Sequence, residues 1–229
     1  MKTLQVFSLA LSLAFVSAGA VAQVAPSSAE AAAYTGLHLA AHKGDVAKVQ
    51  RLAASDAALN ATDGYGRTSL HVAAFARQRE VIRALAKAGA DLNGLENDRY
   101  DAVTIASVAD DEATLKVLLE LGASAKQVTS RYDGTALIAA AHLGHDGVVR
   151  QLIAAGAPLD HVNNLHWTAV IESIVLGDGG ARHQATLKAL IDAGANLQLT
   201  DRGGQTPLAL AKARGFTAMV SMLEKAGAR

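Results

Sequence analysis

Residues 66–74 read Gly66-Arg67-Thr68-Ser69-Leu70-His71-Val72-Ala73-Ala74, and parts of this stretch return at regular steps along the chain. Thr68 belongs to a series spaced 33, 33, 34, 33 and 38 positions apart: Thr35, Thr68, Asp101, Thr135, Thr168 and Thr206. A series of leucines has similar steps: Leu52, Leu85, Leu118, Leu152, Leu190 and Leu223. So does a series of Gly-Ala pairs, which begin at Gly89, Gly122, Gly156, Gly194 and Gly227. Three series with one period predict a unit of about 33 residues that occurs six times.

Each series has a physical reason. Thr and Asp side chains accept hydrogen bonds from the free amides of a helix's first turn, so the first series predicts helix starts. In Thr206-Pro207 the proline falls at the first helical position, where its missing N–H costs nothing. The leucines have apolar neighbours at helical spacing, as in Val81-Ile82-x-x-Leu85, and the glycines can adopt positive φ and end that second helix. Each unit is predicted to be helix, tight turn, helix, glycine stop and an extended stretch.

These residues resemble the ankyrin repeat, whose pattern is roughly G-x-T-P-L-H-x-A-A-x-x-G-H followed by V-V-x-x-L-L-x-x-G-A. Residues 66–74, Gly204-Gln205-Thr206-Pro207-Leu208, and Gly144-His145 with Val148-Val149 carry the resemblance, which covers about Tyr34 to Arg229. It implies an all-α fold, an ankyrin-type α-solenoid of about six helix-turn-helix repeats with projecting hairpin loops. The expected units are 34–62, 63–95, 96–128, 129–162, 163–200 and 201–229.

The resemblance also assigns structural roles. His38 and His71 occupy the T-x-x-H position, three residues after Thr35 and Thr68, where an imidazole bonds a threonine hydroxyl and backbone. Thr206 with Pro207 is expected to start a helix in the same way. His38 and His42 are four apart and offer a two-histidine zinc site as the alternative, but the repeat frame uses His38 for hydrogen bonding.

The N-terminus carries the pattern of a secretory signal. Lys2 is followed by a mostly apolar run from Leu4 to Val16, and Ala20-Val21-Ala22 is a small-x-small cleavage pattern. We therefore expect a signal peptide over 1–22, a linker over 23–33, and export to a bacterial periplasm, which the complete lack of cysteine favours. A retained membrane anchor is the alternative, but the apolar run is shorter than the roughly 20 residues that span a bilayer.

Composition and motifs exclude several functions. The chain has 21 Lys+Arg against 21 Asp+Glu and 51% hydrophobic residues, which argues against a disordered chain and against a nucleic-acid partner. The absence of Cys removes thiol nucleophiles and Cys-based metal sites. The sequence has no G-x-x-x-x-G-K-[ST], H-E-x-x-H or G-x-S-x-G motif, so we expect no enzyme, no metal and no cofactor.

The fifth unit departs most from the pattern, because five additional residues fall between its two helices, around 177–183. Glu172 lies at a frame position that is apolar in the other units: Leu39, Val72, Ile105, Ala139 and Leu210. We expect a polar recognition patch anchored by Trp167, since aromatic and arginine side chains often carry binding energy. Its candidate residues are His142, His166, Trp167, Glu172, Asp178, Arg182 and His183. The alternative is that Trp167 packs between hairpins and that the insertion is merely tolerated.

These features predict an exported, monomeric, non-catalytic scaffold. The family resemblance implies that it binds a partner protein through its concave groove and hairpin tips, without nucleic acid and without a membrane anchor once the signal is cleaved. A small-ligand-binding or stress-protective periplasmic protein that uses the fifth-unit insertion is the alternative.

Overall fold

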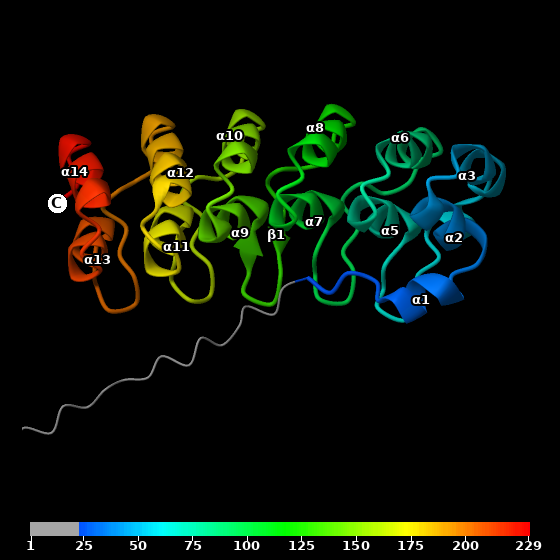
Figure 1. Ribbon diagram of the computed structural model, residues 1–229, viewed down its shortest axis with the longest axis horizontal. Helices are drawn as coiled ribbons and strands as arrows, with labels where there is room; N and C mark the ends of the chain where they lie inside the picture. Colours follow the sequence, from blue (N-terminus) through cyan, green and yellow to red (C-terminus); the bar gives the residue numbers. More distant parts are fainter. Residues whose placement is uncertain (1–22) are drawn as a thin grey trace, which may run out of the picture.

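The computed structural model describes residues 23–229, and the signal peptide predicted over 1–22 lies outside these described residues. Fourteen helices are assigned in this part of the chain, and twelve of them form six successive pairs (Figure 1). The pairs are α2 Gly36–Lys43 with α3 Val46–Leu52, α5 Ser69–Phe75 with α6 Arg79–Lys87, α7 Ala102–Val108 with α8 Glu112–Glu120, α9 Ala136–Leu143 with α10 Asp146–Ala154, α11 Ala169–Val175 with α12 Ala181–Asp192, and α13 Pro207–Ala213 with α14 Thr217–Lys225. The remaining two are α1 Ser28–Ala33 and α4 Asp56–Leu59. The predicted all-α ankyrin-type solenoid is confirmed.

The pairs stack side by side in two layers, with the first helix of each pair in one layer and the second helix in the other (Figure 1). Each helix packs against its partner and against the equivalent helix of the next unit. The repeating leucines fill the space between the layers with at most 1% of their surface exposed: Leu85, Leu118, Leu152, Leu190 and Leu223. Leu52 differs, with 38% exposed, because α3 ends the stack and buries Val49 instead.

The residues of the Thr/Asp series all cap first helices. Asp101, Thr135, Thr168 and Thr206 each accept a hydrogen bond from the backbone amide three residues further on. Thr35 caps α2 without such a side-chain bond. The glycines of the Gly-Ala pairs take φ values of +77° to +94°, a region that other residues rarely adopt, and they follow the ends of the second helices.

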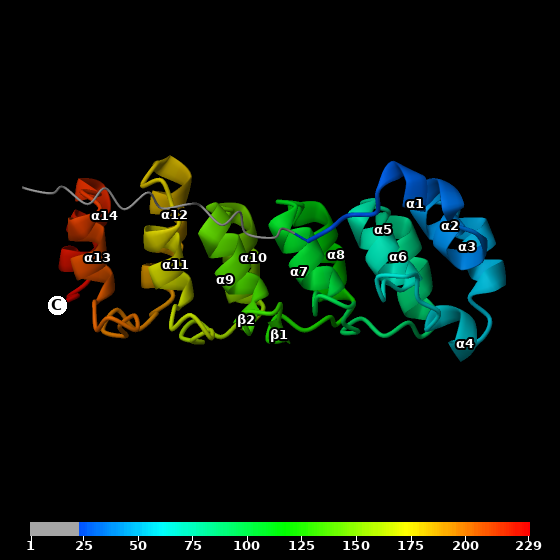
Figure 2. The ribbon, with the colours of Figure 1, turned by 90° about the horizontal axis from the view of Figure 1, so that it is seen from below.

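Hairpin loops project from the first-helix layer and lie in a row (Figure 2). One loop contains the strands β1 Val128–Thr129 and β2 Gly134–Thr135, which pair antiparallel. Backbone hydrogen bonds join neighbouring loops: Asn97 N to Tyr65 O at 3.0 Å, Ser130 N to Arg99 O at 2.9 Å and Asn164 N to Tyr132 O at 2.9 Å. These bonds connect the first four loops, and Arg202 Nη2, which donates to Asn164 O at 2.9 Å, connects the fifth.

The segment 23–33 corrects the expectation of a linker, because it contains helix α1. The sequence Ser27-Ser28-Ala29-Glu30 forms a capping box: Glu30 N donates to Ser27 Oγ at 3.2 Å, and Ser27 N donates to Glu30 Oε2 at 2.8 Å. Three alanines then continue the helix. The Ser-x-x-Glu signature at Ser27 and Glu30 is the sequence feature that marks this helix start.

The five additional residues of the fifth unit are divided between loop and helix. The loop before α12 spans 176–180, against 76–78 and 109–111 in units two and three. Helix α12 has 12 residues, whereas α6, α8, α10 and α14 have 9 each. Thus two extra residues lengthen the loop and three extend the helix, so Arg182 and His183 lie in the first turn of α12.

Candidate functional site

Glu172 lies inside α11 and does not reach the surface, contrary to its expected place in an exposed recognition patch. Only 5% of it is exposed; at the same frame position Val72 and Ile105 are buried, whereas Leu39, Ala139 and Leu210 are partly exposed. The carboxylate accepts one hydrogen bond from Asn163 Nδ2 at 2.9 Å, and its other oxygen is 3.6 Å from Nδ1 of His142. This helix face points into the packing between units, so burial and not surface recognition defines the environment of Glu172.

Burial controls the charge of this pair. It raises the pKa of Glu172 to about 7, although the hydrogen bond from Asn163 acts in the opposite direction. It also lowers the pKa of His142, with the nearby His183 and His145 acting in the same direction. Near neutral pH a substantial share of molecules therefore holds Glu172 as the neutral acid beside a neutral imidazole.

Asp178 and His183 form a second group that holds the fifth unit on the fourth. His183 Nδ1 is 2.8 Å from Asp178 Oδ1, and its Nε2 is 2.9 Å from the backbone oxygen of His142 near the end of α9. Both ring nitrogens face acceptors, and the imidazolium form donates both hydrogen bonds. His145 makes the corresponding contact one unit earlier, because its Nδ1 is 2.9 Å from the backbone oxygen of Ser107.

Arg182 connects units that are not neighbours. Its Nη2 donates to Asp110 Oδ2 at 2.7 Å, and its Nε lies 3.7 Å from Asp146 Oδ1. Asp110 belongs to unit three, Asp146 to unit four and Arg182 to unit five. The candidates in the insertion are therefore occupied by contacts within the chain, and they leave only Asp178 and part of Arg182 in solvent.

His166 and Trp167 lie in the hairpin of unit five. His166 is exposed and takes φ +63°, at the tip position where units two and six have Gly66 and Gly204. The Asn163 side chain accepts a hydrogen bond from Trp167 N at 3.0 Å and closes the turn, while the Trp167 side chain is half-buried. The structure thus separates these two residues from the insertion, and the seven candidates do not form one continuous patch.

The histidines assigned structural roles contact backbone oxygens, His38 in the next unit and His71 near the end of its own unit. His38 Nε2 is 2.9 Å from the backbone oxygen of Arg67. His71, 1% exposed, lies with Nδ1 2.9 Å from Thr68 Oγ1 and Nε2 3.0 Å from Gly94 O. Burial lowers the pKa of His71, which keeps the ring in the neutral form that can accept from the Thr68 amide and donate to Gly94.

Two features were missed at the sequence level, and the first is a row of apolar side chains on the hairpins. Among residues 23–229, ten large hydrophobic residues are exposed, and six of them lie in these loops: Tyr65, Leu95, Val128, Tyr132, Val162 and Leu165. Across from them, Leu143 and Leu176 are exposed at the ends of α9 and α11. Aligning the units would have revealed the row, because Tyr65, Tyr132 and Leu165 each precede the cap residue by three positions.

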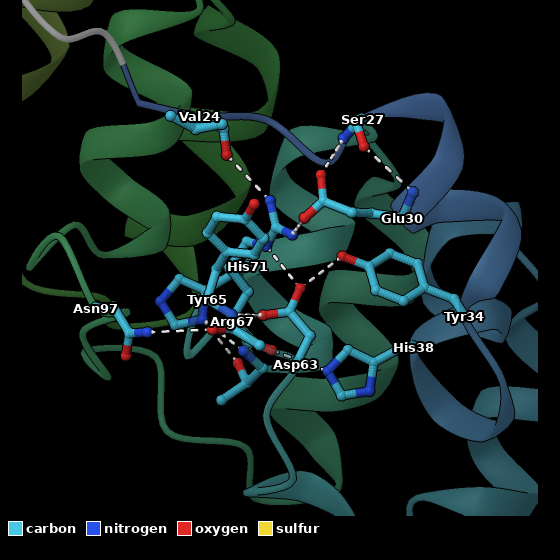
Figure 3. A network of polar contacts seen from close by, with 12 residues as sticks. Val24, Ser27, Glu30, Tyr34, His38, Asp63, Tyr65, Arg67, His71 and Asn97 are labelled. Atoms are coloured by element: carbon cyan, nitrogen blue, oxygen red, sulfur yellow. Dashed lines mark hydrogen bonds and ion pairs between the residues drawn. The ribbon is translucent and has the colours of Figure 1, made fainter.

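The second missed feature is a polar network around Arg67 (Figure 3). The Arg67 side chain is 1% exposed and bonds Asp63 Oδ2 through Nε at 2.7 Å and Glu30 Oε1 through Nη2 at 2.7 Å. Its Nη1 donates to the backbone oxygen of Val24 at 3.1 Å. Burial alone would raise the pKa of Asp63, but hydrogen bonds from Tyr34 and Arg67 outweigh it and leave that pKa below its usual value.

Some kinds of site are not found in the described part of the chain. Among residues 23–229, no group of three or more His, Cys, Asp or Glu side chains is placed to hold a metal ion. The same residues include no helix with the length and apolarity needed to cross a membrane.

Comparison with known proteins places these observations in a family. The profile described as Ankyrin repeats (3 copies) matches residues 13–96 and 102–201. The ankyrin repeat protein YahD of Escherichia coli (strain K12) is 40% identical over 100 residues, which span 43% of this chain and only half of YahD. An ankyrin repeat domain from Acinetobacter baumannii AYE is 40% identical with a TM-score of 0.79, covering 84% of this chain and 98% of that one. The ankyrin repeat domain of Bcl-3, a member of the IkappaB protein family, is 26% identical with a TM-score of 0.76, covering 86% and 88%. The chain therefore belongs to the ankyrin repeat family.

Proposed function

We propose that this chain is an exported, non-catalytic scaffold that binds a partner protein through its hairpin tips and the adjoining groove of units four and five. The observation that carries the proposal is the row of exposed apolar side chains on hairpins that are hydrogen-bonded to one another. Ankyrin repeat domains typically act as protein-binding scaffolds, and this row supplies a surface for that role.

The row is suited to binding because its geometry is fixed in advance. Tyr132 is 38% exposed and Leu165 is 36% exposed, and the bond from Asn164 N to Tyr132 O joins their two loops. A surface that is already ordered loses less conformational entropy when it binds. Tyrosine is also among the residues that most often carry binding energy.

Charged pairs lie beside the apolar side chains. Arg99 contacts Asp133 at 2.9 Å, and Arg131 contacts Asp98 at 2.9 Å, each pair linking unit three to unit four. All four side chains are more than one third exposed, so the pairs add little stability and remain available to orient a charged partner.

Export is a separate part of the proposal. It is supported by Lys2, the apolar run that follows and the Ala20-Val21-Ala22 pattern. N-terminal sequencing of the chain recovered from a periplasmic fraction should begin at Gln23; an uncleaved chain in the cytoplasm would contradict it. The small-ligand alternative is not proposed, because Asp178, Arg182 and His183 contact the chain itself.

A matched pair of variants tests the binding surface. Tyr132→Ser with Leu165→Ser removes two apolar tips, and Leu52→Ser removes an equally exposed leucine at the far end of the stack. All chains serve as bait for partners in a periplasmic extract, and circular dichroism checks that each folds. We expect the double variant to lose the partners that the unmodified chain and Leu52→Ser retain. Equal capture by all three would contradict a tip site.

A further inference from the structure

The segment 23–33, which we call the N-terminal strap, lies over units two and three. Figure 1 shows it passing from α1 below α5 and α7, and Figure 2 shows it crossing these first helices, apart from the row of hairpins. The strap covers Arg67, and together with Asp63 it accounts for the contacts of a guanidinium that is 1% exposed. The strap therefore crosses the first-helix layer and covers a charged position there.

The Arg67 guanidinium is placed to bind a peptide segment through two of its nitrogens. Figure 3 shows Asp63 on one edge of the guanidinium, while the other two nitrogens reach the strap. Nη1 donates to the backbone oxygen of Val24, and Nη2 donates to the carboxylate of Glu30. The Tyr65 ring lies 4.5 Å from the guanidinium carbon and screens one of its faces from water. The hydrogen bonds from Arg67 to the strap thus involve one main-chain oxygen and one acidic side chain, and no other side chain of the strap.

Little else holds the strap in place. Helix α1 has six residues and none of them is buried, and Val24 is 48% exposed. An isolated helix of this length is not stable in water, so it depends on its attachment. Ala31 packs partly against the core, while Ser27 and Glu30 bond mainly to each other and to Arg67. Gln23 and Pro26 are also partly buried, but Arg67 supplies the one charged contact of the strap.

We propose that Arg67 and Asp63 form a docking site for an acidic peptide segment, that the strap fills this site in cis, and that a partner's segment carrying a glutamate or aspartate takes its place. A carboxylate on a guanidinium makes a charge-assisted hydrogen bond, which is stronger than a bond from a neutral group. Because the strap is tethered, its effective concentration is of millimolar order, so an incoming segment competes well only when the strap's own contact is weakened. The site is distinct from the tips of units four and five and does not depend on them.

The test uses the full chain and a chain with a weakened strap, Ser27→Ala with Glu30→Gln. The probe is a fluorescein-labelled peptide with the sequence of residues 23–33, and its binding is followed by fluorescence anisotropy. We expect the weakened chain to bind the peptide at least about tenfold more tightly than the unmodified chain. A peptide with glutamine in place of the glutamate should bind the weakened chain about tenfold less tightly.

Controls separate a peptide site from a loss of folding. Glu80→Gln removes a glutamate that is 77% exposed on α6 and should leave peptide binding as in the unmodified chain. Arg67→Met, added to the weakened chain, should abolish binding while circular dichroism shows that the helices remain. If that variant does not fold, hydrogen exchange decides instead: excess acidic peptide should deprotect residues 24–30 of the unmodified chain.

Several results would overturn the proposal. Equal binding of the glutamate and glutamine peptides would show that the carboxylate is not recognised. Equal binding to the weakened and unmodified chains would show that the strap does not occupy the site. The Tyr132→Ser, Leu165→Ser chain should bind the peptide with the same affinity as the unmodified chain. Failure of the tip site and failure of the Arg67 site are therefore separate outcomes.

Discussion

Arg67 in unit two and Glu172 in unit five are both buried charged residues, and they differ in how their charge is compensated. Arg67 faces two carboxylates at 2.7 Å, and burial of the cluster does not discharge it. Glu172 has one neutral hydrogen-bond donor and an imidazole at 3.6 Å, and its pKa rises to about 7. The difference shows that burial alone does not set the protonation state, because the available countercharge decides whether a buried group keeps its charge.

The largest effect should come from breaking the compensated cluster. Arg67→Met leaves Asp63 beside Glu30 without a cation, and removal of one partner of a buried ion pair typically costs about 3–5 kcal/mol. We expect the free energy of unfolding in urea to fall by about that amount at pH 7. A loss well below this range would mean that solvent enters the cluster and compensates the carboxylates.

Glu172→Gln should raise the free energy of unfolding, and it should do so only above acidic pH. The pKa of Glu172 is raised from 4.5 to about 7 in the folded chain, so its favourable contribution is complete below about pH 4.5. That contribution declines as the pH rises to about 7 and is absent above it. Glutamine keeps the shape without the charge, so the variant should be more stable than the unmodified chain by up to about 3 kcal/mol at pH 8.

Urea unfolding at pH 5 and pH 8 measures this difference. The gain from Glu172→Gln should be small at pH 5 and large at pH 8. Thr114→Val, at a buried hydroxyl on α8, provides a control whose effect does not follow the titration of Glu172. A gain that is the same at both pH values would show that Glu172 does not titrate in this window.

The smallest effect on stability should come from the hydrogen bond between His183 of unit five and the His142 backbone oxygen of unit four. His183→Ala removes the hydrogen bond to the His142 backbone oxygen together with the contact to the exposed Asp178, and His145→Ala removes the matching bond to Ser107. Each should cost about 1 kcal/mol, and the two losses should be similar if the insertion serves only to deliver His183. Capture of partners by His183→Ala should equal that of the unmodified chain; a selective loss of capture would restore the insertion as a binding site.

The sequence predicted the features that depend on local rules. Thr135 and Thr168 cap helices, and Gly156 takes a positive φ, because a cap or a left-handed turn needs only its immediate neighbours. Helix α1 was also within reach, since Ser27 and Glu30 form a capping box that the sequence contains.

The predicted site was harder, because its residues act across units. Glu172 was expected on the surface, but the packing of α11 between α9 and α13 determines which way it points. His183 and Arg182 look like free polar side chains until the extended α12 brings them to His142 O and Asp110. The partner of Arg67 lies 37 positions earlier, at Glu30, a separation that no local pattern encodes.

The contact from Arg182 to Asp110 changes how the stack can come apart. In a solenoid whose units touch only their neighbours, opening proceeds one unit at a time from either end. This contact joins residues 72 positions apart and passes over unit four, so it is a second-neighbour link. Opening of unit four or unit five breaks this link as well as the neighbour contacts. Because Arg182 is 54% exposed, the link adds only about 0–1 kcal/mol, but it is a coupling between second neighbours that the repeat pattern does not contain.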